Sequence, residues 1–124
     1  MAKEWTFKVF ISERGNDVFE EWLNTLPKKA QAKIERRIRY LEIEKTWRRP
    51  FFDSLSGYTD LYEIRVVFNN IQYRPIGGFG PKSGEFTILI GAIEKGDKFE
   101  PKNALNIANK RSKLIAKEGY TNEY

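Results

Sequence analysis

Residues 61–76, LYEIRVVFNNIQYRPI, decide the fold, because two segments of alternating apolar residues flank a pair of asparagines. Asparagine tolerates the positive φ that a two-residue hairpin turn demands. With Asn69 and Asn70 in the turn, the sequence predicts an antiparallel hairpin of two strands, residues 61–68 and 71–76.

The turn also fixes which residues of the hairpin face each other. Phe68 faces Ile71, so Arg65 faces Arg74 in a non-hydrogen-bonded pair, where opposed Cα atoms come within about 4.5 Å. Directly opposed like charges cost stability in a sheet, so this pair calls for a neutralising neighbour or an anionic ligand. Glu63 is the candidate neighbour. One carboxylate does not balance two guanidiniums, which favours a ligand such as phosphate.

The two faces of the hairpin differ in polarity. Alternation places Glu63, Arg65, Gln72 and Arg74 on one face and apolar side chains on the other. Pro75 lacks the N–H that its position should donate to the opposite strand, so a bulge or a ladder end is expected there. The apolar face consists of Tyr62, Ile64, Val66, Phe68, Ile71 and Tyr73.

The residues before the hairpin predict one strand and two helices. Residues 5–11 alternate as a strand does. A helix with Asn16 as its N-cap should follow, and Pro27 should start a second helix after so short a connection that the two pair as a hairpin. Their apolar positions recur at helical spacing: Val18, Phe19, Trp22, Leu23 and Leu26, then Ala30, Ile34, Ile38 and Leu41.

The remaining segments complete an α+β domain. Residues 47–60 have no clean period and are expected to form a loop that tucks Phe51 and Phe52 into the core. Glycine-rich residues 77–84 lack a complete Walker spacing and predict a mobile hairpin loop, and residues 86–93 predict a last strand. Pro101 should open a final helix that packs on the sheet through Ala104, Leu105, Ala108, Leu114 and Ile115. Residues 118–124 are expected to fray, and 1–124 to form one domain.

Composition narrows the chemistry. The 124 residues include no cysteine and no histidine, which excludes disulfides, thiolate zinc sites and Ser-His or Cys-His catalysis. No metal or small-molecule cofactor is expected. A net charge of +5 suits an anionic partner such as nucleic acid. The absence of a long apolar run and of a signal-peptide pattern predicts a cytoplasmic protein without a membrane partner.

Two further groups of cations allow two interpretations each. The second helix carries a basic surface that is either a solvated face, partly balanced by glutamates, or an RNA contact. Lys95 and Lys98 follow the last strand and either reach over the polar face, with Glu94 pointing to the opposite face, or form an ordinary charged turn. The basic residues of the helix are Lys28, Lys29, Lys33, Arg36, Arg37 and Arg39.

Four motifs in this order resemble a known family: LYEIR at 61–65, IQYRPIGGFG at 71–80, FTILIGAIEK at 86–95, and a proline-led helix containing Ala108. They look like the phage-related HigB-type branch of the RelE/ParE toxin superfamily. The resemblance implies a RelE-like fold, with an N-terminal strand and a helical hairpin packed on a small antiparallel sheet with a C-terminal helix. It also implies metal-independent cleavage of mRNA on the ribosome, and a cognate antitoxin, expected to be a helix-turn-helix protein, that silences the toxin.

The resemblance assigns roles residue by residue. Arg74 would hold the scissile phosphate, Arg65 would support it, and Lys95 would assist proton transfer or bind RNA. Many relatives place two consecutive basic residues where this chain has Glu94-Lys95, and others use a late tyrosine or histidine. The expected RNA-binding residues are Lys29, Lys33, Arg36, Arg37 and Lys98.

Two other functions remain open from the sequence. A ParE-like protein uses the same fold to poison DNA gyrase without cutting RNA. A phage-derived nucleic-acid-binding module without catalysis would rely on the basic helix.

Overall fold

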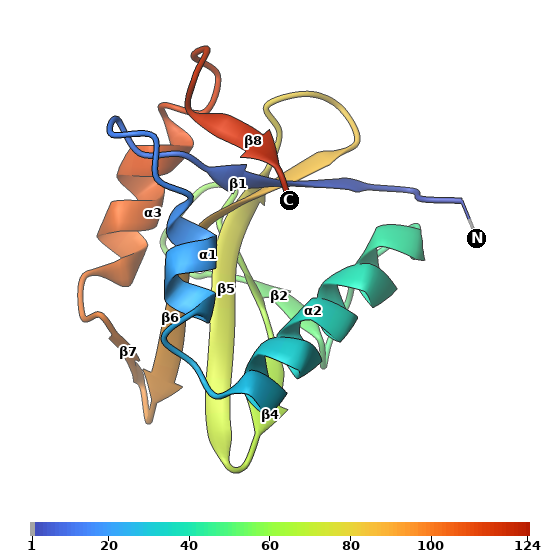
Figure 1. Cartoon of the computed structure of the whole chain (residues 1–124), viewed down its shortest axis with the longest axis vertical. Coiled ribbons are helices and arrows are strands. Elements are labelled where there is room, and N and C mark those ends of the chain that lie inside the picture. The colour runs from blue at the N-terminus through green and yellow to red at the C-terminus, as the bar shows by residue number, and fades with distance from the viewer. Residues whose placement is uncertain (1) are drawn as a thin grey trace.

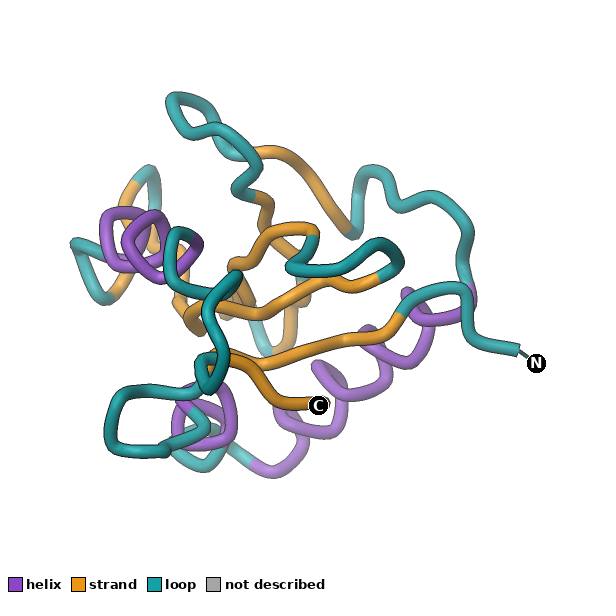
Figure 2. The backbone as a smooth tube through the Cα atoms, turned by 90° about the horizontal axis from the view of Figure 1, so that it is seen from above, coloured by secondary structure: helices purple, strands orange, loops and turns teal. Residues whose placement is uncertain are grey.

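A mixed sheet of eight strands forms the centre of the structure, a computed structural model that describes residues 2–124. Three helices cover it, α1 and α2 on one face and α3 on the other (Figure 1; Figure 2). The elements are β1 Thr6–Phe10, α1 Val18–Leu23, α2 Lys28–Ile43, β2 Phe52–Ser54, β3 Tyr62–Ile64, β4 Val66–Phe68, β5 Ile71–Phe79, β6 Glu85–Lys95, β7 Lys98–Glu100, α3 Ala104–Ser112 and β8 Thr121–Glu123.

The order of the strands confirms the α+β class and refines the expected sheet. The main path runs β2-β3-β5-β6-β1-β8, with β4 on β5 and β7 on β6. All pairs are antiparallel except β1 with β6, which is parallel. The sheet is therefore mixed and not purely antiparallel. None of the helices in the described part of the chain is long and apolar enough to span a membrane.

The hairpin predicted from residues 61–76 is confirmed. Asn69 and Asn70 have φ values of 54° and 65°, and Phe68 faces Ile71. The same register resumes in β3, but the ladder is interrupted around Arg65. Pro75 explains the break, because it has no N–H to donate at this point. The Arg65 N–H points outward and donates to the carbonyl of Phe51 at 2.8 Å.

Both predicted helices form, with two differences from expectation. The N-cap of α1 is Asp17 and not Asn16. The Asp17 Oδ1 accepts a hydrogen bond from the Glu20 N–H at 3.0 Å, and an N-cap side chain typically binds the backbone N–H of the residue three positions later. The axes of α1 and α2 diverge in Figure 1, and each helix packs mainly on strands, α1 on β6 and β1, α2 on β4 and β1. The predicted apolar stripe of α2 is fully buried.

Two apolar clusters fill the two sides of the sheet. The first lies under α1 and α2 and includes Phe7, Phe19, Ile34 and Tyr73. The second lies under α3 and includes Ile76, Ala104 and Ala108 with Ile115. At Gly91, a Cβ atom would lie 2.0 Å from the Trp22 ring, so glycine allows α1 to sit directly on β6.

Several segments that the sequence assigned to loops are strands. Residues 47–60 contain β2, where Phe52 is buried as predicted and Phe51 is half-buried. Gly77 and Gly78 belong to β5 and not to a mobile loop. Both positions need glycine, because a Cβ atom would lie 2.2 Å from the Thr87 carbonyl oxygen at Gly77 and 2.6 Å from the Asp60 carbonyl oxygen at Gly78.

The C-terminal segment was wrongly expected to fray. It forms β8, which pairs antiparallel with β1, and the Tyr124 N–H donates to the Phe7 carbonyl at 3.0 Å. Strand β8 thereby occupies the outer edge of β1, where unpaired backbone groups would otherwise remain. The pairing uses backbone groups, so the polar sequence Thr121–Glu123 gave no apolar pattern by which to recognise it.

Candidate functional site

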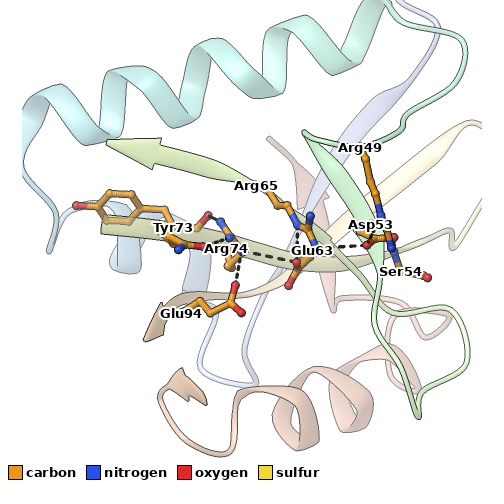
Figure 3. Close-up of polar contacts among 9 residues, drawn as sticks. Arg49, Asp53, Ser54, Glu63, Arg65, Tyr73, Arg74 and Glu94 are labelled. Atoms are coloured by element: carbon orange, nitrogen blue, oxygen red, sulfur yellow. Dashed lines mark hydrogen bonds and ion pairs between the residues drawn. The ribbon is translucent and has the colours of Figure 1, made fainter. Parts of the chain in front are cut away.

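Six charged side chains form a continuous row across four strands and one loop, and we call this row the ionic chain. Strand register brings them together: Asp53 pairs with Glu63, and Glu63 lies diagonally from Arg74 through the Glu63–Ile76 pair. Figure 3 shows the row running along one face of the sheet. Its members, in spatial order, are Arg49, Asp53, Arg65, Glu63, Arg74 and Glu94.

Arg74 lies at the buried end of the ionic chain. Its Nε donates to Glu94 Oε1 at 2.9 Å and lies 3.7 Å from Glu63 Oε2. Nη1 donates to the carbonyl of Tyr73 at 3.1 Å, and Nη2 donates to the side-chain oxygen of Gln72. Only 5% of the Arg74 side chain is exposed. Each of the three nitrogens of this guanidinium therefore has a partner within the protein.

Arg65 connects the buried end to the surface. Its Nε donates to Glu63 Oε2 at 2.7 Å, and its Nη2 lies 3.3 Å from Asp53 Oδ2. The hydrogen bond to Glu63 raises the pKa of Arg65, against desolvation and together with the nearby carboxylate charges. Desolvation alone would raise the pKa of Asp53, but hydrogen bonds from Arg49 and Ser54 and the charges of Arg49 and Arg65 lower it overall.

The charges of the ionic chain balance. Three arginines alternate with three carboxylates. The expectation that Glu63 alone must answer Arg65 and Arg74 was therefore wrong, because Asp53 and Glu94 also contribute. A neutral, hydrogen-bonded row of this kind is a stable arrangement for charges that are partly removed from water. An anionic ligand that binds Arg74 Nε would have to replace Glu94, whereas Nη1 and Nη2 have neutral acceptors.

Glu94 and Lys95 lie on the opposite faces from those expected. Glu94 pairs with Gln72, so its side chain points to the face of Arg74. Lys95 points to the other face and forms an ion pair with Glu100 at 2.7 Å, and it faces Lys98 across the β6–β7 hairpin. The structure thus brings Arg65 and Arg74 together and leaves both lysines apart from them.

The cations of α2 form a second basic surface. Lys33, Arg36, Arg37 and Tyr40 line a pocket of about 410 Å³ that Phe51 closes. Ala92 is the β6 partner of Arg74, so the two side chains lie on the same face of the sheet. Ala92 packs in the cluster under α3, whereas α2 covers the cluster on the other face. The pocket and the ionic chain therefore lie on opposite sides of the sheet.

Sequence reasoning missed Arg49, Asp53 and Glu94 as members of the site. Arg49 lies in the loop before β2, and Asp53 lies in β2, an edge strand too short to be recognised from its pattern. Glu94 was missed because a bulge between Ile76 and Gly77 shifts the β5–β6 register by one residue. A shift of one residue exchanges the two faces of a strand.

Comparison with known protein families shows a match over most of the chain. The family model described as "Phage derived protein Gp49-like" matches residues 21–113, most of the chain. The matched range runs from within α1 to the end of α3 and contains the whole ionic chain and the α2 pocket. No curated protein and no solved structure matches the chain.

Proposed function

The chain belongs to the Gp49-like family of phage-derived proteins, a RelE-like toxin family of toxin–antitoxin systems, and we propose that it is a toxin that cleaves mRNA on the ribosome. Membership of a toxin family implies a cognate antitoxin. In this proposal the chain belongs to the HigB-type branch, acts in the cytoplasm without a metal or cofactor, and is silenced by a helix-turn-helix antitoxin.

The observation that carries the proposal is the pair of guanidiniums that Glu63 holds on one sheet face. Arg65 Nε and Arg74 Nε lie 2.7 and 3.7 Å from the same Glu63 oxygen. Guanidiniums bind phosphate oxygens through paired N–H groups, and cations that face a developing oxyanion stabilise the transition state. In RNA cleavage a ribose 2′-OH loses its proton as it attacks the adjacent phosphorus to form a 2′,3′-cyclic phosphate, the bond to the 5′ oxygen breaks, and this oxygen takes up a proton.

Each arginine has a defined part in this reaction. Arg74 binds the scissile phosphate and Arg65 supports it, once the phosphate has replaced Glu94 at Arg74. Lys95 and Lys98 bind RNA from the β6–β7 hairpin, because their distance from the arginine pair favours that role over proton transfer. The RNA approaches along the basic surface of α2, where Lys29, Lys33, Arg36 and Arg37 neutralise phosphates.

The test is brief expression of the chain followed by mapping of mRNA ends. Cuts within translated codons are expected. The matched variant is Arg74→Gln combined with Glu94→Gln, because Arg74→Ala alone would leave Glu94 without its cation. The double variant should fold and bind its antitoxin but neither cut mRNA nor inhibit growth. Lys110→Gln, an exposed cation of α3, is the control and should behave as the parent.

The balance of charge in the ionic chain also suits a second candidate, a non-catalytic nucleic-acid-binding module. In such a module the ionic chain is structural, and the cations of α2 bind the ligand. Charge reversal at Lys33, Arg36 or Arg37 would then abolish function, whereas the Arg74→Gln/Glu94→Gln protein would retain it. A ParE-like gyrase poison would instead induce DNA damage and leave mRNA intact.

A further inference from the structure

The pocket on α2 combines flat aromatic surfaces with positive charge. Its helical residues, Lys33, Arg36, Arg37 and Tyr40, follow the i, i+3, i+4, i+7 spacing of one helix face. The Arg37 guanidinium carbon lies 3.8 Å from the centre of the Phe51 ring. Tyr40 meets the same ring edge-on, with centroids 5.6 Å apart and an interplanar angle of 77°.

The cations at this pocket have no acidic partners within residues 2–124. None of the ion pairs of the protein involves Lys33, Arg36 or Arg37, and no carboxylate lines the pocket. Arg37 Nη1 is buried without a hydrogen-bond partner in the same residues. Unsatisfied buried donors are costly and rare in folded proteins. The positive charge of this surface is therefore not balanced by carboxylates of residues 2–124, in contrast to the ionic chain.

The shape and chemistry of the pocket favour an unpaired nucleotide over an acidic peptide. Sequence-tolerant binding of single-stranded RNA uses base stacking on aromatic rings and on arginine planes, with cations along the backbone. Phe51, Arg37 and Tyr40 supply the planar groups, and Arg36 and Lys33 supply the cations. An acidic peptide would use the charge but gain nothing from the stacked planes.

We infer that this pocket binds one unpaired nucleotide of single-stranded RNA, with the base on the Arg37–Phe51 stack and the phosphates at Arg36 and Lys33. The inference rests on the proposed function only in that this RNA is the substrate of the toxin. Because the pocket lies away from the ionic chain, it binds RNA outside the cleavage site.

The experiment measures the fluorescence anisotropy of a labelled adenosine hexamer with 2′-O-methyl riboses, which has no free 2′-OH and is not cleaved. A second probe has the same backbone with abasic positions. Arg37→Lys keeps the charge but removes the plane, so it should weaken binding of the hexamer about tenfold and leave the salt dependence unchanged. It should not affect the abasic probe. Arg36→Gln should weaken both probes and lower the slope of log affinity against log salt by about one.

The matched control is Lys110→Gln, which removes an exposed cation from α3 and should leave both affinities within about twofold. Equal binding of the hexamer and the abasic probe, or an unaffected Arg37→Lys protein, would overturn the inference. So would a polyglutamate peptide that binds more tightly than the hexamer and depends on Arg37, since the occupant would then be an acidic protein segment. If the predicted binding pattern holds but mRNA ends stay intact in cells, the proposed cleavage is wrong and the pocket assignment stands.

Discussion

Arg74, the residue that we propose binds the scissile phosphate, has its hydrogen-bond partners within the protein. Its guanidinium has partners in Glu94, Gln72 and the Tyr73 carbonyl, and its side chain is 5% exposed. Phosphate and carboxylate offer the same kind of oxygen to an arginine, so the proposed binding of RNA at Arg74 would exchange one anion for another. The affinity of the site then depends on how strongly Glu94 competes.

This competition makes a prediction for Glu94→Gln. The amide keeps an acceptor for Arg74 Nε but removes the negative charge, so the 2′-O-methyl hexamer should bind about tenfold more tightly in an anisotropy titration. Growth inhibition should increase in parallel. Glu13→Gln, which removes an exposed carboxylate from the segment before α1, is the control and should bind as the parent does. Weaker binding by Glu94→Gln would mean that Glu94 helps to hold RNA and does not compete with it.

The sequence predicted part of this site for a clear physical reason. The Asn69-Asn70 turn fixes the pairing of the hairpin, so the opposition of Arg65 and Arg74 could be counted from the turn. The position of Glu94 could not be counted from this turn, because it depends on the register between β5 and β6. Without the bulge between Ile76 and Gly77, Lys95 and not Glu94 would share a face with Arg74. A bulge leaves no distinct pattern in a sequence.

At the level of elements, length and periodicity decided what could be predicted. The 16-residue helix α2 shows its buried stripe over four turns, and β5 and β6 are long strands with nearly continuous burial. Strands β2, β7 and β8 have three residues each, too few to show a pattern, and backbone pairing with a neighbouring strand defines each of them. Strand β8 also brings Tyr124 against Phe19 on α1, with ring centroids 5.7 Å apart.

Tyr124 predicts how this contact responds to alkaline pH. Desolvation, followed by the charge of Glu35, raises the pKa of Tyr124 from 10.0 to about 12. The unfolded chain releases this proton near pH 10 and the folded protein near pH 12. The stabilisation is thus complete below pH 10 and is lost as the pH rises toward 12. A shift of two units corresponds to about 2.7 kcal/mol, and because Tyr124 is 43% exposed, screening by solvent reduces this to about 1 kcal/mol.

The measurement is the free energy of unfolding in urea at pH 9 and at pH 11 for the parent and for Tyr124→Phe. Other tyrosines and lysines titrate in both proteins, so the difference between the two isolates Tyr124. We expect the parent to lose about 0.5 kcal/mol more than Tyr124→Phe over this interval, about half of the full effect, because the folded protein releases the proton only near pH 12. Equal losses would show that β8 does not shield the hydroxyl.

In the molecule as a whole, the two basic features lie on opposite sides of one sheet. The ionic chain lies on the side of α3 and is balanced, whereas the pocket lies on the side of α2 and lacks carboxylates. The segment before and within β2 connects them, because the Phe51 side chain closes the pocket and the Phe51 carbonyl accepts from the Arg65 N–H at 2.8 Å. An RNA strand that contacts both features must pass around this edge of the sheet.

This arrangement predicts that the two sites contribute independently to RNA binding. Arg36→Gln should weaken binding of the hexamer, and Glu94→Gln should strengthen it. The change in binding free energy of the double variant should equal the sum of the two single changes within about 0.5 kcal/mol, because the residues share no partner. The salt dependence should decrease with Arg36→Gln, because this change removes a cation from an exposed helix face. A larger deviation from this sum, of either sign, would mean that the segment at β2 couples the two faces of the sheet. Phe51→Leu, introduced into all members of the same cycle, should then abolish the deviation.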